Sequence, residues 1–464
     1  MTVSGIDENI GVTTLRPGDA EYETARRVWN GMIDRRPALI VRCATTEDVV
    51  EALSLSRRQG LPVAVRGGGH NVAGFATIDD GMVIDLGPMN DVHVDADRRV
   101  AMVGGGARWV DVDRETQAFG LATPGGVVSD TGVAGLTLGG GLGWLRGVHG
   151  LSCDNLIAAE VVLADGRVVQ ASAEDDAELL WGLRGGGGNF GVVTRFEFAL
   201  HPVGPDVFFA FTFHDGRGQG MRDALRRFRD FCAETPDEIA PLGVCGVVPP
   251  GHEMFPPHLH GVPFFLVAAL YAGPPEEGER MLAPLRSLGS PLVDFSGRMP
   301  YTEVQRSFDE DYPAVKLRYY WKSANLPVLD DAVIDRIVRH AKRQPSPLST
   351  TDLWHIGGAV SRVAEDSAAF DGRAAGFMLN PEANWADPRQ DEANIGWVRD
   401  FHDAVREFAD GRAYLNFPGF HEDGEATLRR TFGRKYDRLL ALKRAVDPEN
   451  VFRSNQNIDP NLDG

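Results

Sequence analysis

The residues that point most clearly to a function in this chain are glycines, because their backbone N–H groups can bind a ligand closely. They cluster along the first 191 positions. The 464 residues include 54 glycines, concentrated at 67–69, 104–106, 125–126, 132–143 and 185–191. A glycine costs roughly 0.5–1 kcal/mol where alanine would serve, so a cluster indicates backbone that approaches a partner closely or adopts φ > 0. Converging backbone N–H groups bind pyrophosphate well. The clusters therefore predict a site for a phosphorylated cofactor, and the first cluster runs directly into His70.

The common nucleotide signatures do not fit these clusters. Residues 186–191 (GGGNFG) satisfy the GxGxxG pattern, but they lead into an expected strand rather than a helix, which disfavours a Rossmann site. The chain has no GxxxxGK[ST] and no GxSxG, which excludes a P-loop in its usual form and a hydrolase nucleophile elbow. The cofactor is thus expected to bind in another way.

Neither a metal centre nor a catalytic thiol is expected. His252, His258 and His260 lie with Glu253 in a proline-rich stretch without an HExxH helix, which favours a solvated loop over a zinc site. The four cysteines form no CxxC pair, and we expect them to be reduced and buried.

Length, charge and the chain start limit the class of protein. A chain of 464 residues favours two domains, or one domain with a large insertion. The formal charge of −19 disfavours nucleic acid and anionic membranes as partners. The longest apolar run, near residues 262–272, is too short for a membrane span, and the N-terminus does not resemble a signal peptide, so we expect a cytoplasmic protein.

Local patterns predict the elements that position the glycine clusters. Thr45–Asp48 resembles a capping box that opens a helix ending at Gly60, and Val63–Arg66 reads as a short strand entered through Pro62. Asp165-Gly166 suits a hairpin turn, and residues 192–200 read as a strand. We further expect helices at Asp19–Met32 and Ala426–Val446.

An ordered series of motifs resembles the berberine-bridge-enzyme-like oxidases of the vanillyl-alcohol-oxidase superfamily, which have a PCMH-type FAD-binding domain. Arg66–Asn71 (RGGGHN) is similar to their covalent-flavin segment. The series continues through 123–126, 131–135, 139–144, 154–155 and 188–193, and it resumes at 357–359, 414–417 and 447–456. Nearly the whole chain takes part in the resemblance.

The resemblance implies an α+β fold with an FAD-binding domain in two parts. Residues 32–204 and 411–464 would form this domain, and residues 205–410 would form an inserted substrate domain built on an antiparallel sheet flanked by helices. The implied partners are a small-molecule substrate and O2, and the protein would be a monomer or a homodimer.

The resemblance also implies the cofactor and its contacts. His70 would bond covalently to the flavin. Many relatives have a cysteine link as well, but Val128 stands at the matching position, so we expect a single link. The residues expected to bind FAD are Arg66, Gly67, Gly68, Gly69, His70, Asn71, Gly125, Val128, Ser129, Gly132, Val133, Gly135, Gly139, Gly140, Gly143, Asp154, Asn155, Gly188, Val193, Tyr414, Asn416 and Asn455.

Three residues are candidates for the chemistry by the same resemblance. Tyr414 is a candidate base, since the family's second tyrosine is Phe417 here. Thr131 matches a position beside flavin N5, although a plain turn residue would also fit. Trp144 lines the substrate cavity or simply packs.

The family's catalytic glutamate has no counterpart in this chain. Arg362 stands at the position where plant relatives place it. The strand 352–356, with Trp354 and His355, is therefore the other expected source of a base, although a structural role is the favoured interpretation of His355.

Three functions remain open. The first is an oxidase that transfers hydride from an aromatic or secondary-metabolite substrate to flavin and is reoxidised by O2. The second is a flavin monooxygenase or oxidative cyclase. The third is a flavin-binding protein without turnover.

Overall fold

A small sheet holds the strand that leads into the first glycine cluster. The computed structural model describes residues 11–420, 422 and 424–462. The strand order is β1 (Thr13–Leu15), β2 (Leu39–Arg42), β4 (Met82–Asp85) and β3 (Val63–Arg66), with β2, β4 and β3 parallel. Helix α2 (Thr46–Gln59) connects β2 to β3; it begins with the expected capping box at Thr45 and ends at Gly60, whose φ is 64°. This local prediction is confirmed.

A second, antiparallel sheet carries the later glycine clusters. Its order is β5 (Val92–Asp95), β6 (Val100–Gly104), β10 (Val192–Ala199), β8 (Leu156–Val162) and β9 (Val168–Ser172). β8 and β9 form the expected hairpin, and β10 begins directly after Gly191. Because the GxGxxG pattern opens a strand, the Rossmann interpretation is excluded.

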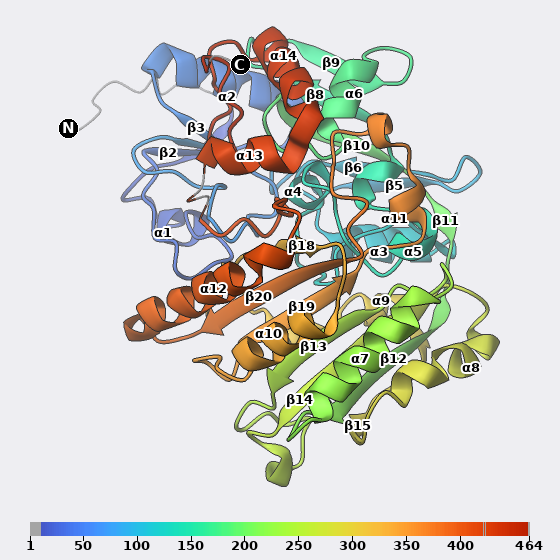
Figure 1. The fold of residues 1–464 in the computed structure, drawn as a ribbon. Helices are drawn as coiled ribbons and strands as arrows, with labels where there is room; N and C mark the ends of the chain where they lie inside the picture. The colour runs from blue at the N-terminus through green and yellow to red at the C-terminus, as the bar shows by residue number, and fades with distance from the viewer. Residues whose placement is uncertain (1–10, 421, 423, 463–464) are drawn as a thin grey trace.

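The C-terminal helices complete the core of this second sheet. Helix α14 (Tyr436–Val446) lies beside α6 (Ala177–Leu183) in Figure 1, and α13 (Gly424–Phe432) precedes α14 in the chain. Their apolar side chains share one core with those of α6 and of the sheet. Segments at the two ends of the chain therefore build one unit.

The middle of the chain forms a nine-stranded antiparallel sheet within the described residues. Its main order is β15 (Pro291–Asp294), β12 (Asp206–Asp215), β14 (Pro263–Tyr271), β13 (Leu242–Val247), β19 (Thr350–His355), β20 (Phe377–Trp385) and β17 (Arg318–Trp321), and β16 (Gly297–Pro300) and β18 (Ala324–Leu326) pair with β12 and β20. This confirms the α+β fold with an antiparallel sheet flanked by helices. The division at 204 and 410 stays a prediction.

Alternate residues of the large sheet face different layers, as the two-residue period of a strand requires. Leu353 and Leu379 share a core with α7 (Gly220–Ala233), α8 (Pro275–Arg286), α10 (Asp331–Ala341) and α12 (Asp391–Val405). Trp354 and Met378 belong to a different core, together with residues of the glycine-rich segment 142–145. The sheet thus presents helices on one face and its other face to the glycine-rich part of the chain (Figure 1).

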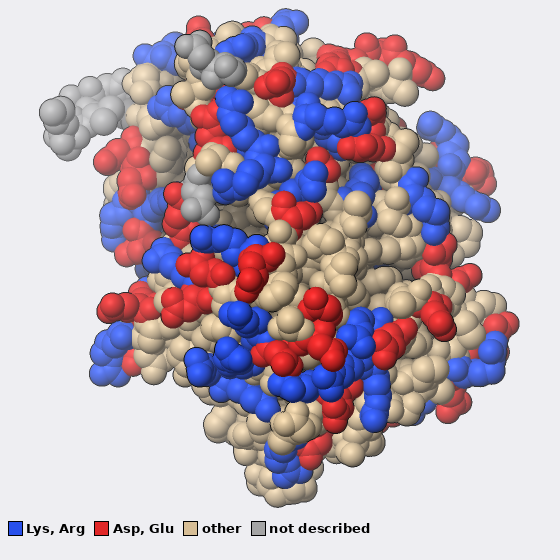
Figure 2. Space-filling model, viewed as in Figure 1, with Lys and Arg blue, Asp and Glu red and all other residues tan. Residues whose placement is uncertain are grey.

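Acidic and basic side chains alternate over the helical face of the large sheet (Figure 2). Arg226 and Arg229 of α7, for example, both pair with Asp331 of α10. As far as the structure describes the chain, none of its helices has the length and apolar character needed to cross a membrane.

Two helix predictions need correction. The expected helix at Asp19–Met32 is only α1 (Tyr22–Ala25), and Trp29 lies beyond it in an irregular segment whose burial imitated helical periodicity. The expected helix at Ala426–Val446 is divided into α13 and α14, because Gly433 has a φ of 49° and starts a 3₁₀ turn (Gly433–Lys435) between them.

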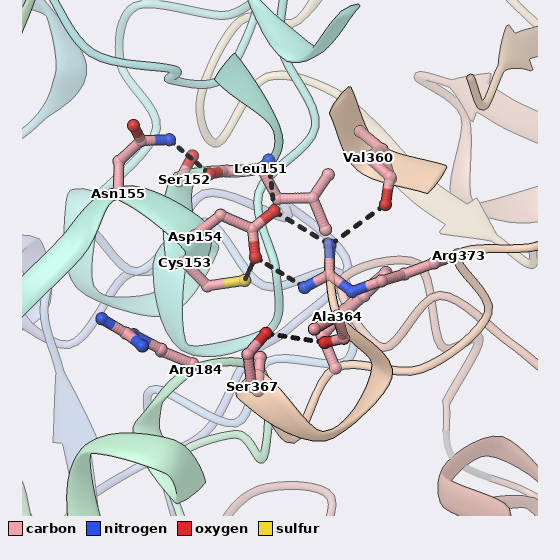
Figure 3. A network of polar contacts seen from close by, with 12 residues as sticks. Leu151, Ser152, Cys153, Asp154, Asn155, Arg184, Val360, Ala364, Ser367 and Arg373 are labelled. Atoms are coloured by element: carbon pink, nitrogen blue, oxygen red, sulfur yellow. Dashed lines mark hydrogen bonds and ion pairs between the residues drawn. The ribbon is translucent and has the colours of Figure 1, made fainter. Parts of the chain in front are cut away.

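A buried ion pair joins the loop before β20 to the glycine-rich part of the chain (Figure 3). Both guanidinium Nη atoms of Arg373 donate to the carboxylate of Asp154, at 2.9 and 2.5 Å. The backbone N–H of Leu151 donates to the same carboxylate. The two side chains are only 7% and 8% exposed, so each charge depends on the other for compensation.

We expect Asp154→Ala to destabilise the fold by about 3–5 kcal/mol, because it leaves a buried guanidinium without its counter-ion. Equilibrium urea unfolding followed by tryptophan fluorescence measures the change. The control is Glu178→Ala, which removes the exposed Glu178–Arg438 pair between α6 and α14 and should cost about 1 kcal/mol or less. Equal losses in the two variants would contradict the prediction.

Candidate functional site

A cavity of about 260 Å³ lies between the glycine-rich segments and the large sheet. Part of its wall is formed by residues 67–72, by helix α4 (Val133–Leu138) and by residues 187–193. β19, β20 and the loop with Phe308 and Tyr312 supply another part. Phe452 and residues 454–456 near the C-terminus complete the wall, so stretches that lie far apart in the chain meet at one site.

Two glycine loops meet backbone to backbone at this wall. A Cβ on Gly68 would lie 2.4 Å from the Cα of Gly132, and Gly69 has a φ of +68°. No side chain fits at Gly68, and the positive φ of Gly69 disfavours any residue other than glycine there. Gly135 of α4 differs, because its Cβ would meet no atom within 4 Å although the residue lines the cavity. Its missing side chain leaves open space for a ligand.

His70 stands at the end of the first glycine loop as a neutral imidazole. Its ring stacks on Trp29, with centroids 4.1 Å apart, and Trp29 stacks in turn on Tyr319. Nε2 is buried without a hydrogen-bond partner, while the residue as a whole is partly exposed at the cavity. Burial lowers the pKa of His70 to about 3. The ring therefore keeps a nitrogen lone pair at neutral pH.

The hydroxyl of Tyr414 is held by the third glycine cluster. Its oxygen accepts hydrogen bonds from the backbone N–H groups of Gly141 and Leu142, each at 3.0 Å, and from Nδ2 of Asn416 at 2.9 Å. Burial raises the pKa of Tyr414 to about 12. The three hydrogen bonds act against burial, but the pKa of Tyr414 stays above its usual value, so the phenol is protonated at neutral pH and cannot take a proton from a substrate.

Two carboxyl groups project into the cavity from the large sheet. Thr350 and Asp352 on β19 pair with Glu382 and Asn380 on β20, so these four side chains share one face. Asp352 and Glu382 are 5% and 3% exposed, and both line the cavity. Trp354 continues the same face, whereas His355 points to the opposite face and contacts Phe377.

Hydrogen bonds and mutual repulsion set the protonation of this carboxyl pair. The hydroxyl of Tyr312 donates to Oε2 of Glu382 at 2.7 Å, and Asn380 donates to Oε1 at 2.5 Å. Thr350 donates to Oδ1 of Asp352 at 3.0 Å. Burial raises the pKa of both carboxyls, and the negative charge of Asp352 raises that of Glu382 further. The pair therefore retains a proton at higher pH than ordinary carboxyls do.

Comparison with known proteins identifies the family. The "FAD binding domain" model matches residues 37–172, and the "Berberine and berberine like" model matches residues 413–459. An FAD-linked oxidoreductase of Dictyostelium discoideum is 31% identical over 458 residues, which cover 98% of this chain and 96% of the relative. The chain belongs to the berberine-bridge-enzyme-like FAD-linked oxidoreductases.

Two further relatives support this membership across the whole chain. The (R)-6-hydroxynicotine oxidase of Paenarthrobacter nicotinovorans is 30% identical and covers 96% of both chains. The crystal structure of 6-hydroxy-D-nicotine oxidase from Arthrobacter nicotinovorans superposes with a TM-score of 0.87 and 28% identity, over 99% of this chain and 100% of that one. The oxidoreductase fold is therefore shown from end to end.

The cavity of this oxidoreductase fits FAD. Gly135 leaves open space in the cavity wall, and the glycine loops offer backbone where side chains would obstruct a bulky cofactor. The partly exposed His70 ring lies at the same wall. These features account for glycines that would otherwise only weaken the fold.

Many residues expected to bind FAD line this cavity: Gly67, Gly68, Gly69, His70, Asn71, Val128, Gly132, Gly135, Gly139, Gly188, Val193, Tyr414, Asn416 and Asn455. Thr131, a candidate for the chemistry, lines it as well. Their individual contacts with flavin stay predictions.

Other expected contact residues do not line the cavity, because local packing occupies them. Arg66 pairs with Asp85 and donates to the carbonyl of Ala25. A Cβ on Gly125 would meet the ring of Trp109 at 2.4 Å, and one on Gly140 would meet Phe370 at 2.7 Å.

The remaining exceptions have structural partners as well. A Cβ on Gly143 would collide with the carbonyl of Gly125, and Val133 is buried at the start of α4. Ser129 donates through its N–H and its hydroxyl to Asp309. Asp154 is neutralised by Arg373.

Asn155 and Trp144 also serve packing. Asn155 donates to the carbonyls of His149 and Leu151. Trp144 is 1% exposed and lies behind the wall, stacked on Phe308, so the cavity-lining alternative for Trp144 is wrong.

Among the cavity residues that sequence reasoning missed, three have polar groups or aromatic rings beside the carboxyl pair: Glu382, Tyr312 and Trp321. The sequence did contain a signal for Glu382. Asn380, Glu382 and Asn384 place polar side chains at every second position of an otherwise apolar strand. Such a pattern in a fully buried strand indicates a polar site rather than a solvent face. No comparable signal marked the other two.

We expect Gly135→Ala to reduce retention of FAD without destabilising the protein, because the added methyl group enters the cavity and not the packed core. The control is Gly396→Ala in α12, where a Cβ also meets no atom within 4 Å but no cavity is near. Both changes should raise helix stability by roughly 0.5–1 kcal/mol. The flavin-to-protein absorbance ratio of purified protein checks this; an equal flavin content in both variants would refute it.

Proposed function

We propose that this oxidoreductase is an oxidase that holds FAD through a single covalent bond to His70 and oxidises a small organic, aromatic or secondary-metabolite substrate with O2. The observation that carries the proposal is the single cavity in which a neutral imidazole, a glycine wall and a buried carboxyl pair meet. Bound FAD supplies a two-electron acceptor that O2 can reoxidise. The protein's own residues bind, orient and deprotonate the substrate.

The state of His70 supports the covalent bond. A neutral imidazole offers a lone pair for bond formation, whereas an imidazolium does not. Stacking on Trp29 restricts the ring to one orientation at the cavity wall. The ring then needs no prior deprotonation to offer this lone pair.

The cysteines support a single link. Cys43, Cys153, Cys232 and Cys245 are all buried, and none of them lines the cavity. Val128 does line it, but it offers no nucleophile. Burial also raises the pKa of the Cys153 thiol, which keeps it in the unreactive form.

The carboxyl pair is the proposed proton acceptor, in place of the Tyr414 expected from the sequence. Asp352 receives one hydrogen bond, on Oδ1, and its Oδ2 makes none within residues 11–420, 422 and 424–462. A free carboxylate oxygen at the cavity can take a proton from a substrate O–H or N–H. Tyr414, whose oxygen already accepts three hydrogen bonds, instead positions the glycine turn.

A monooxygenase or oxidative cyclase is the alternative function, and Thr131 on the cavity wall is the residue that favours it. The ratio of H2O2 formed to substrate oxidised distinguishes an oxidase from a monooxygenase or oxidative cyclase. An oxidase yields one H2O2 per substrate oxidised, whereas oxygen incorporated into product is missing from that count. Thr131→Val should alter the reaction with O2 and leave anaerobic flavin reduction unchanged if this residue directs oxygen chemistry.

His70 should keep the flavin attached after denaturation. Acid-precipitated wild-type protein should stay yellow, and peptide mapping should find one FAD on the His70 peptide alone. His70→Ala should release its flavin, because no other cavity residue forms the bond. A colourless wild-type pellet would sink the covalent claim, and a flavinylated cysteine peptide would sink the single link.

Asp352→Asn should slow anaerobic flavin reduction by roughly 10²–10⁴-fold, the usual contribution of one general base. In the wild type this rate should fall as pH drops through the raised pKa of the pair, since the base must be deprotonated. The comparison variant is Tyr414→Phe, which should mainly lower thermal stability by leaving three donors without an acceptor. A slow Tyr414→Phe beside a fast Asp352→Asn would reverse the assignment.

A further inference from the structure

The substrate end of the cavity contains acidic groups and no basic side chain. Asp352 on β19, Glu382 on β20 and Tyr312 all line it. Asp311 stands near enough to raise the pKa of Asp352, and the charges of Glu382 and Asp311 raise the pKa of Tyr319. No lysine or arginine lines the cavity in the described part of the chain, although both are abundant on the outer face in Figure 2. A carboxylate or phosphate substrate would therefore meet repulsion with no compensating cation.

Aromatic rings surround the same carboxyl pair. Trp321 and Tyr312 contact each other edge to face at 5.4 Å, and Phe417 packs against Trp321 at 5.6 Å. All three line the cavity. The guanidinium of Arg146 lies 5.2 Å from the ring centroid of Trp354 and is bound to three backbone carbonyls. Aromatic faces beside buried carboxylates attract an organic cation.

A metal ion does not explain the acidic pair. Nowhere in the described chain do three or more His, Cys, Asp or Glu side chains come together in a way that could hold one. Two oxygens of Glu382 already accept hydrogen bonds, from Tyr312 and Asn380, which leaves Oδ2 of Asp352 as the open acceptor. One acceptor within an aromatic enclosure suits a single ammonium group better than a multidentate cation.

We infer that the substrate of this enzyme is an organic amine, bound as its ammonium ion by the Asp352–Glu382 pair between Trp321 and Tyr312. The inference rests on the proposed function and names its substrate class. The cation supplies the counter-charge that the buried pair lacks. A neutral aromatic alcohol would fill the aromatic space without meeting this electrostatic need.

Binding of an ammonium ion at this pair has an effect that does not depend on turnover. Two buried carboxyls in one cavity repel each other when both are ionised, so the pair retains a proton near neutral pH. A cation bound beside them favours the fully ionised form and expels that proton. Binding of a quaternary ammonium, which has no N–H to exchange, should therefore release up to one proton to the buffer.

Calorimetry on the flavin-containing enzyme tests this with three unreactive probes of similar size. These are benzyltrimethylammonium, neutral 2-phenyl-2-propanol and anionic phenylacetate, titrated at pH 7 in two buffers of different ionisation enthalpy. We expect the ammonium to bind about tenfold or more tightly than the alcohol and to release protons, with phenylacetate weakest. Equal affinity for ammonium and alcohol, or no proton release, would overturn the inference.

Three variants assign the effect to the pair. Asp352→Asn and Glu382→Gln should each weaken ammonium binding about tenfold and abolish proton release, while binding of the alcohol should stay within a factor of about two. Glu392→Gln on α12 makes the same charge change on the exposed outer surface and should match the wild type. An unchanged flavin spectrum and melting temperature exclude misfolding. Proton release that survives in both cavity variants would refute the assignment.

The outcome is separable from that of the proposed oxidase function. If the probes bind as expected but no amine bleaches the flavin anaerobically, the oxidase proposal fails and the ammonium site stands. If neutral substrates bleach the flavin and the ammonium probe does not bind, the oxidase stands and the substrate class is wrong.

Discussion

The close contact between the backbone of Gly68 and that of Gly132 is the constraint on which the site depends. A single Cβ at either position would lie within 2.4 Å of the other loop, so the two loops meet only because both lack side chains. This contact joins the end of the parallel sheet to the start of α4. It also leaves a wall of backbone where a large planar cofactor can lie without obstruction.

The position and charge of His70 follow from this contact. The glycine loop directs the imidazole away from bulk water and onto Trp29, where burial keeps it neutral. The same burial that keeps the ring neutral also leaves Nε2 without a partner. Such an unsatisfied group reduces stability, which is a common cost at functional sites.

The second half of the site comes from a different part of the fold and obeys a different rule. The large sheet holds Asp352 and Glu382 at positions fixed by strand register, and a slip of one residue would turn both toward the helices. Buried ion pairs such as Asp154–Arg373 hold the two parts together. One wall of the cavity is thus shaped by missing side chains, and the opposite wall by buried carboxyl groups with no lysine or arginine among the described lining residues.

The sequence by itself determined the local features: the capping box at Thr45, the strand that enters the glycine loop, the family and the cavity-lining glycines. These depend on backbone conformation, which short patterns encode. Only the tertiary structure decided that Glu382 and Tyr312 join Asp352, that Trp144 packs on Phe308 outside the cavity lining, and that Asp154 pairs with Arg373. The physical reason is that strand register and contacts between residues far apart in the chain decide which side chains are neighbours. These neighbours in turn set the burial and the pKa of each group.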